Sequence, residues 1–264
     1  MRTYKFHQGR LPLLISMPHN GTEIPLEMKC NMSAHGSRLV DTDWFLDKLY
    51  SFACPLGCSV LCPLYSRYVI DLNRHPQGKA LYNKADNTEL CPLTTFEYQR
   101  IYECLEPGET EVADRIERYF KPYHDRISSW ISETKKHFGF AVLFDVHSIK
   151  SQLPRFFEGR LPELNLGTMS ANSCHPELEK IMASSLKKSG YTFAHNERFK
   201  GGYITRHYGK PAENVFSVQL EIAQNTYLNE KTFEIIPEKF EQLQKLLRRL
   251  VEKMISWMKK YGRF

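Results

Sequence analysis

Short apolar runs alternate along the chain with longer segments in which apolar residues recur at helical spacing. The run at 141–146 (AVLFDV) is nearly continuous, which is typical of a strand that is covered on both faces. Phe45, Leu46 and Leu49 instead recur at the spacing of one helix face. These patterns predict strands at 11–17, 59–64, 68–72, 141–146 and 215–222, and helices at 40–52, 109–137, 176–189 and from 237 onward. The alternation predicts an α/β layer fold around a largely parallel or mixed sheet.

The last predicted helix begins near Pro237, and proline suits the first turn of a helix. Its leucines form one apolar stripe with Met254 and Trp257, which indicates packing against the core. The chain has 264 residues, a length that suits one large α/β domain or two small ones. Because the sequence shows no internal repeat, low-complexity tract or linker, we predict a single domain over residues 1–264.

Polar residues follow or end several of the predicted strands. His19 comes directly after the first strand, His147 ends the AVLFDV strand, and Glu221 lies near the end of the last one. In open α/β sheets, ligands bind at the carboxyl ends of the strands. We therefore expect these side chains to converge, with Asp43, at the start of the helix after the first loop, reaching the same edge.

Two histidines and a carboxylate are a ligand set that suits catalytic Zn²⁺, which keeps one position open for water. His19, Asp43 and His147 fit the ligand role, and Glu221 fits the role of the base that accepts the proton of that water. Each residue also has a purely structural interpretation. A lone histidine often only makes hydrogen bonds, Asp43 suits a helix start, and Glu221 is able to pair with a Lys or Arg.

A second group of polar residues is basic. Arg67 precedes an Asn73-Arg74 pair, and arginine forms bidentate hydrogen bonds with carboxylates. The glycine-rich stretch at 199–209 supplies Arg206, a candidate for holding a second anionic group, although a surface hairpin with solvated charges is an equal alternative. We predict that these residues bind a small substrate with carboxylate groups.

The composition argues against several classes of binding partner. The net charge is +6 with no long basic run, so nucleic-acid binding has little support, while a mild positive charge favours small anionic substrates. No apolar stretch approaches the length of a membrane span, and no signal peptide follows Met1. The seven cysteines form no Cys-x-x-Cys pair, which favours free thiols in a reducing compartment. We therefore expect a cytoplasmic protein with neither a membrane nor a nucleic-acid partner; the sequence gives no oligomeric state.

Six ordered segments together resemble the N-formylglutamate amidohydrolase family, and the resemblance covers nearly the whole chain. The segments are LPLLISMPHNGTEIP at 11–25, DTDWFLDKLY at 41–50, SRYVIDLNR at 66–74, LFDVHSIKSQLPRFFEGRLPELNLGT at 143–168, NERFKGGYITRHYGKP at 196–211 and VQLEIAQNTYL at 218–228. The resemblance implies a three-layer α/β/α fold of the zinc-carboxypeptidase-like group with a mixed, largely parallel central sheet. It also implies the metal-dependent hydrolysis of N-formyl-L-glutamate to formate and L-glutamate, a step of histidine degradation.

The same resemblance implies roles for single residues. His19 and His147 resemble the histidine ligands of the group, Glu221 its general base, and Asn73-Arg74 its clamp for a substrate carboxylate. The family pattern favours Asp43 as the second metal ligand, with Glu23 and Asp41 as alternatives. Arg67 is expected to stabilise the oxyanion together with the metal, and Arg206 to help hold the substrate. Zn²⁺ is the default metal, and Co²⁺, Mn²⁺ and Ni²⁺ are also suited to such ligands.

Two other functions fit the same residues. A related metallohydrolase would share the metal site and act on another N-acyl amino acid or on a peptidoglycan-derived amide. A non-catalytic module would bind dicarboxylates through Arg67, Arg74 and Arg206 without a catalytic metal. The segment at 77–106 shows little pattern and is predicted to be a long connection that walls the site.

Overall fold

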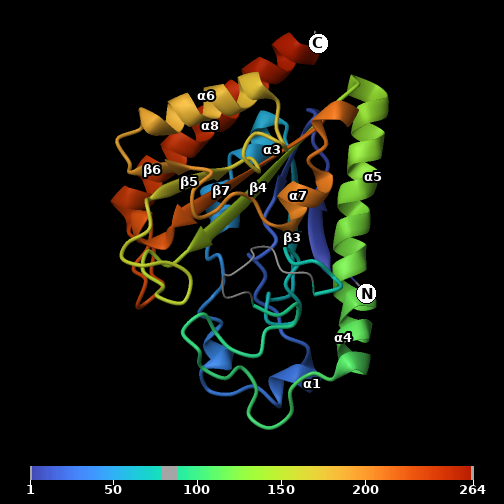
Figure 1. Cartoon of the computed structure of the whole chain (residues 1–264), viewed down its shortest axis with the longest axis vertical. Coiled ribbons are helices and arrows are strands. Elements are labelled where there is room, and N and C mark those ends of the chain that lie inside the picture. Colours follow the sequence, from blue (N-terminus) through green and yellow to red (C-terminus); the bar gives the residue numbers. More distant parts are fainter. Residues whose placement is uncertain (1, 79–87, 263–264) are drawn as a thin grey trace.

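Seven strands form one sheet in the order β1-β3-β2-β4-β7-β5-β6 (Figure 1). The computed structural model describes residues 2–78 and 88–262, and every structural statement concerns these residues. The strands are β1 (Tyr4–His7), β2 (Leu13–Ser16), β3 (Ser59–Pro63), β4 (Ala141–Ile149), β5 (Leu164–Gly167), β6 (Phe193–His195) and β7 (Val215–Ala223). The β1–β3 and β5–β7 pairs are antiparallel and the other four pairs are parallel. The predicted mixed, largely parallel sheet is confirmed.

Helices cover both faces of this sheet. The α-helices are α1 (Leu26–Lys29), α2 (Leu46–Leu49), α3 (Ala53–Leu56), α4 (Glu109–Arg115), α5 (Lys121–Phe138), α6 (Pro176–Lys187), α7 (Tyr203–Tyr208) and α8 (Pro237–Gly262). Short 3-10 helices lie at Gly36–Arg38, Pro211–Glu213 and Gln224–Thr226. The predicted helix at 109–137 is a continuous helical stretch, in which the π-helical turn Ile116–Phe120 joins α4 to α5.

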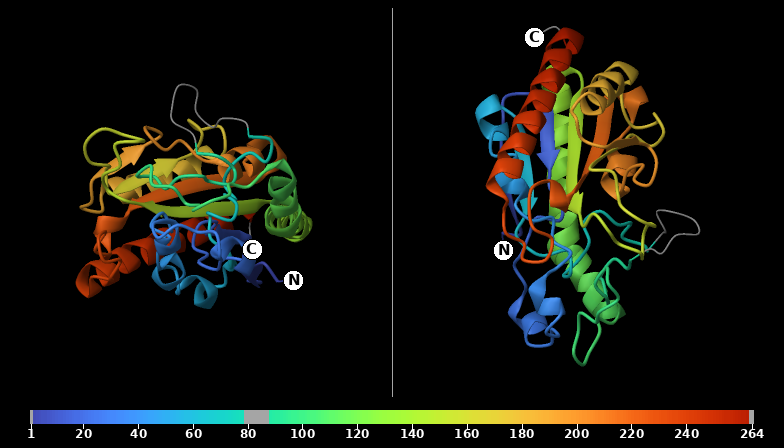
Figure 2. Two further views of the ribbon diagram at one scale, coloured as in Figure 1. Left: turned by 90° about the horizontal axis from the view of Figure 1, so that it is seen from below. Right: turned by 90° about the vertical axis from the view of Figure 1, so that its left-hand side faces the viewer.

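Alternate residues of the central strands point to two separate cores. Phe144 of β4 and Leu220 of β7 belong to a core that also contains buried residues of α2, α3, α6 and α8. Leu143 belongs to a second core, on the other face, with residues of α5 and α7. Figure 2 shows the two helical layers on either side of the sheet. This arrangement confirms the predicted three-layer α/β/α architecture, and the apolar stripe of α8 is part of the first core.

The strand predicted at 68–72 is wrong. These residues form turns and irregular backbone, where the N–H of Val69 donates to the carbonyl of Ser66 and the N–H of Asp71 to that of Leu90. Tyr68, Val69, Ile70 and Leu72 are buried in the second core. The apolar run therefore reflects burial of a loop beneath a helical layer and not pairing in the sheet.

The helix predicted at 40–52 is mostly wrong as well. Regular helix is limited to α2, and Phe45 just before it has a left-handed φ of 59°. Asp43 lies in the irregular segment before it, where its N–H donates to the carbonyl of His19 at 3.0 Å. That contact joins Asp43 to the first loop, which a continuous helix would not allow.

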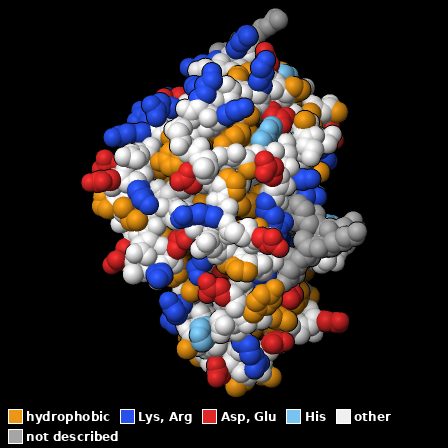
Figure 3. Space-filling model, turned by 60° about the vertical axis from the view of Figure 1, so that its left-hand side comes forward, with side chains coloured by type: hydrophobic (Ala, Val, Ile, Leu, Met, Phe, Trp, Pro, Cys, Tyr) orange, Lys and Arg blue, Asp and Glu red, His pale blue; other side chains and the backbone are white. Residues whose placement is uncertain are grey.

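The surface agrees with the mixed composition of the sequence. In Figure 3, basic side chains are densest toward the top of the view, and acidic side chains lie among them lower down. None of the described helices is both long and apolar enough to cross a membrane. All seven cysteines are free, as predicted. Of the segment predicted at 77–106 as a long connection, residues 79–87 lie outside the described residues; the rest is largely irregular, and Phe96 lines the pocket described below.

Candidate active site

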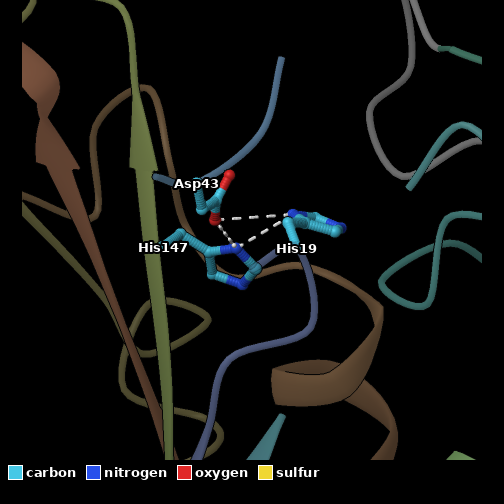
Figure 4. Close-up of side chains that lie close together, drawn as sticks. All are labelled: His19, Asp43 and His147. Atoms are coloured by element: carbon cyan, nitrogen blue, oxygen red, sulfur yellow. Dashed lines mark hydrogen bonds and ion pairs between the residues drawn. The ribbon is translucent and has the colours of Figure 1, made fainter. Parts of the chain in front are cut away.

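Three buried side chains from separate parts of the chain point toward one another at the carboxyl ends of β2 and β4 (Figure 4). The Nδ1 atom of His147 lies 3.2 Å from Nδ1 of His19 and 3.1 Å from Oδ2 of Asp43. The third side of this triangle, from His19 Nδ1 to Asp43 Oδ2, measures 3.7 Å. The sequence prediction that these three residues converge is confirmed.

The size of the triangle suits a tetrahedral metal ion. Bonds of about 2.0–2.2 Å place the ligand atoms of such an ion about 3.3–3.6 Å apart. Three electron-donating atoms this close together in a buried site repel one another unless a cation or a proton lies between them. His19, Asp43 and His147 are 5%, 1% and 2% exposed, so water does little to screen that repulsion. The three residues therefore fit a divalent cation.

Each histidine is oriented by a second carboxylate. His19 Nε2 lies 2.7 Å from Oδ1 of Asp71, and His147 Nε2 lies 3.0 Å from Oδ2 of Asp145. An Nε2–H that donates to these oxygens leaves the Nδ1 lone pair of each ring directed at the shared point. Carboxylates behind ligating histidines fix the ring tautomer and raise the basicity of the ligand in just this way.

The parallel pairing of β4 and β7 places several of these groups on one face. Asp145 pairs with Gln219 and His147 pairs with Glu221, so the four side chains leave the sheet on the same side. That side is the one covered by α5 and α7, because the intervening Leu220 belongs to the opposite core. Burial disfavours the charged form of His147, but Asp145 and Asp43 outweigh burial and raise the pKa of its imidazole well above the usual range.

Glu221 is buried at 6% exposure and lines the same pocket as the triangle. Burial raises the pKa of Glu221 to about 8; the charge of His147 opposes that shift and the charge of Asp43 adds to it. Perturbed carboxyl groups beside a cluster of metal-type ligands are common in active sites, where they exchange protons with substrate.

The two alternative carboxylates for the metal lie elsewhere. Asp41 accepts hydrogen bonds from the Tyr68 hydroxyl at 2.7 Å and from the N–H of Phe96 at 2.9 Å. Glu23 is exposed and pairs as an isolated bridge with Tyr65. Asp43 is thus the carboxylate that the structure brings to the two histidines, and its Oδ2 also accepts from the N–H of Ser148 at 3.1 Å.

The loop after β3 carries two arginines that share one buried acid. Arg67 Nη2 donates to Asp71 Oδ2 at 2.6 Å, and Arg74 Nε lies 3.9 Å from the same oxygen. Burial raises the pKa of Asp71, but the charges of His19 and Arg67 outweigh burial and hold it well below its usual range. Arg67 also reaches the metal-type cluster, with Nη1 lying 3.9 Å from Asp43 Oδ1.

Asn73 connects this loop to α7 and to His147. Its Oδ1 accepts from the N–H of Ile204 at 2.7 Å, and its Nδ2 donates to Asp145 Oδ2 at 3.3 Å and lies 2.9 Å from His147 Nε2. A Cβ on Gly202 would come within 2.3 Å of that Nδ2, so any larger residue at this position would displace the Asn73 side chain. Asn73 lines the pocket, and its predicted contact with a substrate carboxylate stays a prediction.

The pocket around the cluster offers about 80 Å³ to the centre of a water-sized sphere. Arg67 and Arg74, which the sequence singled out, line it, and so does Arg198, which it did not. Arg206 is not among the lining residues; it lies on α7, with its Nε donating to the carbonyl of Gly201 at 2.8 Å. The role predicted for Arg206 in substrate binding therefore stays a prediction.

Sequence reasoning also gave no role to the two carboxylates behind the histidines. The position of Asp145 was predictable from the sequence. Residues two apart in a strand share a face, and Asp145 is two residues before His147. Asp71 lies 52 positions after its partner His19, and no local pattern links the two. Arg198 was part of a quoted segment, but its place in the pocket depends on how the loop before α7 folds.

Known proteins match this chain over most of its length. The model of the N-formylglutamate amidohydrolase family matches residues 11–228. The chain is 42% identical to an N-formylglutamate deformylase of Pseudomonas putida over 97% of both chains. It is also 42% identical to one of Pseudomonas aeruginosa over 96% of both chains. The crystal structure of an N-formylglutamate amidohydrolase from Ralstonia eutropha superposes with a TM-score of 0.84 at 27% identity, covering 98% of this chain and 99% of the other. The resemblance stated from the six segments is confirmed.

Proposed function

The chain belongs to the N-formylglutamate amidohydrolase family, and we propose that it hydrolyses N-formyl-L-glutamate to formate and L-glutamate in a metal-dependent reaction. The observation that carries this proposal is the triangle of His19, Asp43 and His147. It lies in one pocket with Glu221 and with arginines suited to a dicarboxylate substrate. We propose that this reaction is a step of histidine degradation, as the family resemblance implies.

His19, His147 and Asp43 would hold the metal, and Asp71 and Asp145 orient the two rings. Two nitrogens and one carboxylate oxygen make Zn²⁺ the first choice, and Co²⁺, Mn²⁺ or Ni²⁺ would also suit them. When bound, such an ion supplies a water that is acidic at neutral pH and a Lewis acid for the formyl carbonyl.

Glu221 is proposed as the general base and then the general acid. It accepts a proton from the water that attacks the formyl carbon, and it returns that proton to the glutamate nitrogen when the C–N bond breaks. Its register opposite His147 supports this role, because it places the carboxyl group on the same face as the metal ligands. Its burial in the pocket limits competing exchange with bulk water.

The basic residues are proposed to hold the charged parts of the substrate. Arg67 lies closest to the ligands, through its contact with Asp43, and is proposed to stabilise the oxyanion that forms on the carbonyl oxygen. Asn73 and Arg74 are proposed to hold one carboxylate, which their place in the pocket wall supports. Arg206 is proposed as a candidate for the other carboxylate.

The proposal treats residues 1–264 as one catalytic domain. A single sheet in which β2 and β3 from the first quarter pair next to β4 and β7 supports this view. The proposed partner is a small dicarboxylate, with no role for nucleic acid or membrane. Seven free cysteines support the proposal that the protein works in the cytoplasm.

The decisive experiment measures formate release from N-formyl-L-glutamate by the purified protein, before and after chelation and again with Zn²⁺ restored. We expect turnover that is lost on chelation and recovered with the metal. Turnover that survives rigorous metal removal would overturn the metal site. No turnover with metal bound would overturn the substrate assignment and favour a related hydrolase of other N-acyl amino acids, or a dicarboxylate-binding module.

A further inference from the structure

Asp43 differs from the two histidines of the cluster in how the chain carries it. His147 lies in a long strand and His19 closely follows one, whereas Asp43 comes from irregular backbone (Figure 4). Its N–H donates to the carbonyl of His19 at 3.0 Å, and Phe45, two residues later, has a left-handed φ of 59°. Because regular structure does not fix this carboxylate, its position depends on contacts with other segments.

Two side chains from the segment after β7 hold the backbone on both sides of Asp43. Gln224 Nε2 donates to the carbonyl of Thr42 at 2.9 Å, and the Tyr227 hydroxyl donates to the carbonyl of Trp44 at 2.8 Å. Thr42 and Trp44 are the residues directly before and after Asp43. Gln224 and Tyr227 are 2% and 0% exposed, so water competes little for these hydrogen bonds. The two bonds therefore restrict the backbone from which the carboxylate projects.

Ser148 extends the same contacts to the carboxyl group itself. Its N–H donates to Asp43 Oδ2 at 3.1 Å, the oxygen that faces both histidines. Its Oγ lies 2.8 Å from the Tyr227 hydroxyl and 3.4 Å from Gln224 Nε2. Because Ser148 directly follows His147 on β4, and Gln224 directly follows β7, the surroundings of Asp43 are tied to two strands of the sheet.

The segment that carries Gln224 and Tyr227 is itself well fixed. It begins directly after β7, the strand of Glu221, with the 3-10 helix Gln224–Thr226. The N–H of Tyr227 donates to the carbonyl of Gln224 at 3.1 Å. Tyr227 also belongs to the first core, where the centroid of its ring lies 6.3 Å from that of Phe240 on α8. A fixed element therefore connects the proposed base to the backbone around the proposed metal ligand.

A metal site depends on ligands that are held close to their binding geometry. Groups behind the ligands commonly set metal affinity, and their loss lowers that affinity about 10- to 100-fold. Two buried carboxylates contact the histidine rings of the cluster in this way. For Asp43, the corresponding contacts come from Ser148 and, through the neighbouring carbonyls, from Gln224 and Tyr227.

We propose that Gln224 and Tyr227 are positioning residues for Asp43, which they hold by the carbonyls on either side so that Oδ2 stays directed at the two histidines. This inference rests on the proposed function, because it takes Asp43 as a metal ligand. It also ties the spacing between the metal and Glu221 to one segment, because the strand that carries Glu221 continues directly into Gln224.

The test measures the Zn²⁺ affinity of Tyr227→Phe and Gln224→Met by competition with a chromophoric chelator. Each variant keeps a side chain of similar shape and removes the group that donates to one carbonyl beside Asp43. We expect the affinity to fall about 10- to 100-fold in both. Loading with Co²⁺ should also give a visible absorption spectrum that differs from that of the wild type, because the spectrum reports the arrangement of ligands around the ion.

Ser173→Ala serves as the matched control. It removes a buried hydroxyl that donates to the carbonyl of Ser217 at 2.8 Å, and Ser173 does not line the pocket. We expect urea unfolding of the metal-free proteins to show losses of stability of similar size in all three variants, with wild-type metal affinity only in Ser173→Ala. Wild-type affinity in Tyr227→Phe and Gln224→Met would overturn the proposal, because their hydrogen bonds would then contribute to stability alone. So would an equal fall in affinity in Ser173→Ala.

The affinity measurement needs no turnover, which separates this inference from the proposed reaction. Weaker metal binding in the two variants supports the positioning role even if N-formylglutamate proves not to be hydrolysed. A wild-type protein that binds no Zn²⁺ would overturn the metal site together with this inference, whereas unchanged affinity in the variants would overturn the inference alone. Tyr227→Phe removes a single oxygen atom, so it decides the outcome if Gln224→Met does not fold.

Discussion

His147 and His19 lie side by side in the candidate site, but the chain holds them by different means. His147 belongs to β4, a fully buried strand that pairs with β7 along all nine of its residues. His19 lies beyond the end of β2, in a turn where the N–H of Asn20 donates to the carbonyl of Met17 at 3.3 Å. A regular ladder fixes the first histidine, while contacts between distant loops fix the second.

The residues behind the two rings show the same difference. Asp145 is two residues from His147 on the same strand, and its other side-chain partners are Ser16 and Asn73, both uncharged. Asp71 comes from another loop and also binds the guanidinium of Arg67. The strand-held half of the site, which consists of His147, Asp145 and Glu221, is therefore fixed mainly by backbone geometry. The loop-held half, His19 and Asp71, is fixed mainly by buried charge. Substitutions in the two halves should therefore differ in how much turnover, metal affinity and stability they remove.

The largest effect is expected on the strand-held half. Glu221→Gln leaves the β4–β7 ladder intact and removes the group proposed to transfer the proton. We expect kcat to fall by about 10²- to 10⁴-fold, the usual contribution of general acid–base catalysis, with metal content unchanged. Formate release and metal analysis of the same preparation check both parts of this expectation.

A suitable control for that variant is Glu213→Gln, which removes an exposed carboxylate just before β7. It should retain wild-type kcat. If Glu221→Gln kept most of its turnover, the base would have to be another group, and the register opposite His147 would have no catalytic meaning.

The second largest effect is expected from removing the carboxylate behind each histidine, and it compares the two halves directly. Asp145→Asn and Asp71→Asn each remove a carboxylate behind one ring, and we expect metal affinity to fall about 10- to 100-fold in both. Asp71→Asn also leaves the charge of Arg67 buried at 7% exposure without its closest partner. Breaking a buried ion pair costs about 3–5 kcal/mol of unfolding free energy. Asp145→Asn should cost clearly less in the metal-loaded protein, because a His147 that binds the metal is neutral and Asp145 then forms no full ion pair with it.

Metal titration measures the affinity, and urea unfolding of the metal-saturated variants measures the stability. Equal losses of stability in Asp71→Asn and Asp145→Asn would show that the halves are held alike, contrary to the comparison above. Unchanged metal affinity in either variant would remove the corresponding histidine from the proposed ligand set.

The difference between the two halves also explains what the sequence could predict. β4 and β7 were recognised because a strand buried on both faces leaves a continuous apolar run, and His147 and Glu221 were then located at strand ends. The strands β1, β5 and β6 are only three or four residues long and polar residues or glycine interrupt or adjoin their apolar positions, whereas the equally short β2 lies within the longer apolar run LPLLISM. The buried loop at 68–72 gave the same apolar pattern as a strand, which led to a wrong prediction.

The site followed the same rule. Convergence of His19, Asp43 and His147 was predicted from strand ends and from the family resemblance, although Asp43 reaches the site from irregular backbone and not from a helix. Asp71 and Arg198 acquire their places only from contacts between segments far apart in sequence. Such contacts produce no periodic pattern in the sequence. A single sequence therefore predicts which residues belong to the site more readily than it predicts the residues that they contact.

The smallest effects are expected from adding one methyl group beside each half. A Cβ on Gly21 would meet the backbone carbonyl oxygen of Tyr65 at 2.2 Å, whereas a Cβ on Gly202 would meet the side chain of Asn73. Overpacking of this kind costs about 1–3 kcal/mol. We expect Gly21→Ala to lie at the upper end of that range, because backbone is displaced, and to weaken metal binding through the adjoining His19 loop.

Gly202→Ala should cost less stability, since the Asn73 side chain is able to rotate away. That rotation breaks the contact of Asn73 with Asp145 behind His147, so kcat/KM should fall more than the unfolding free energy does. Gly108→Ala, where an added Cβ meets nothing within 4 Å, provides the baseline and should stay within about 0.5 kcal/mol of wild type. If Gly202→Ala instead destabilised the protein more than Gly21→Ala, the strand-held half would be the more tightly packed one, and the distinction between the two histidines would have to be reversed.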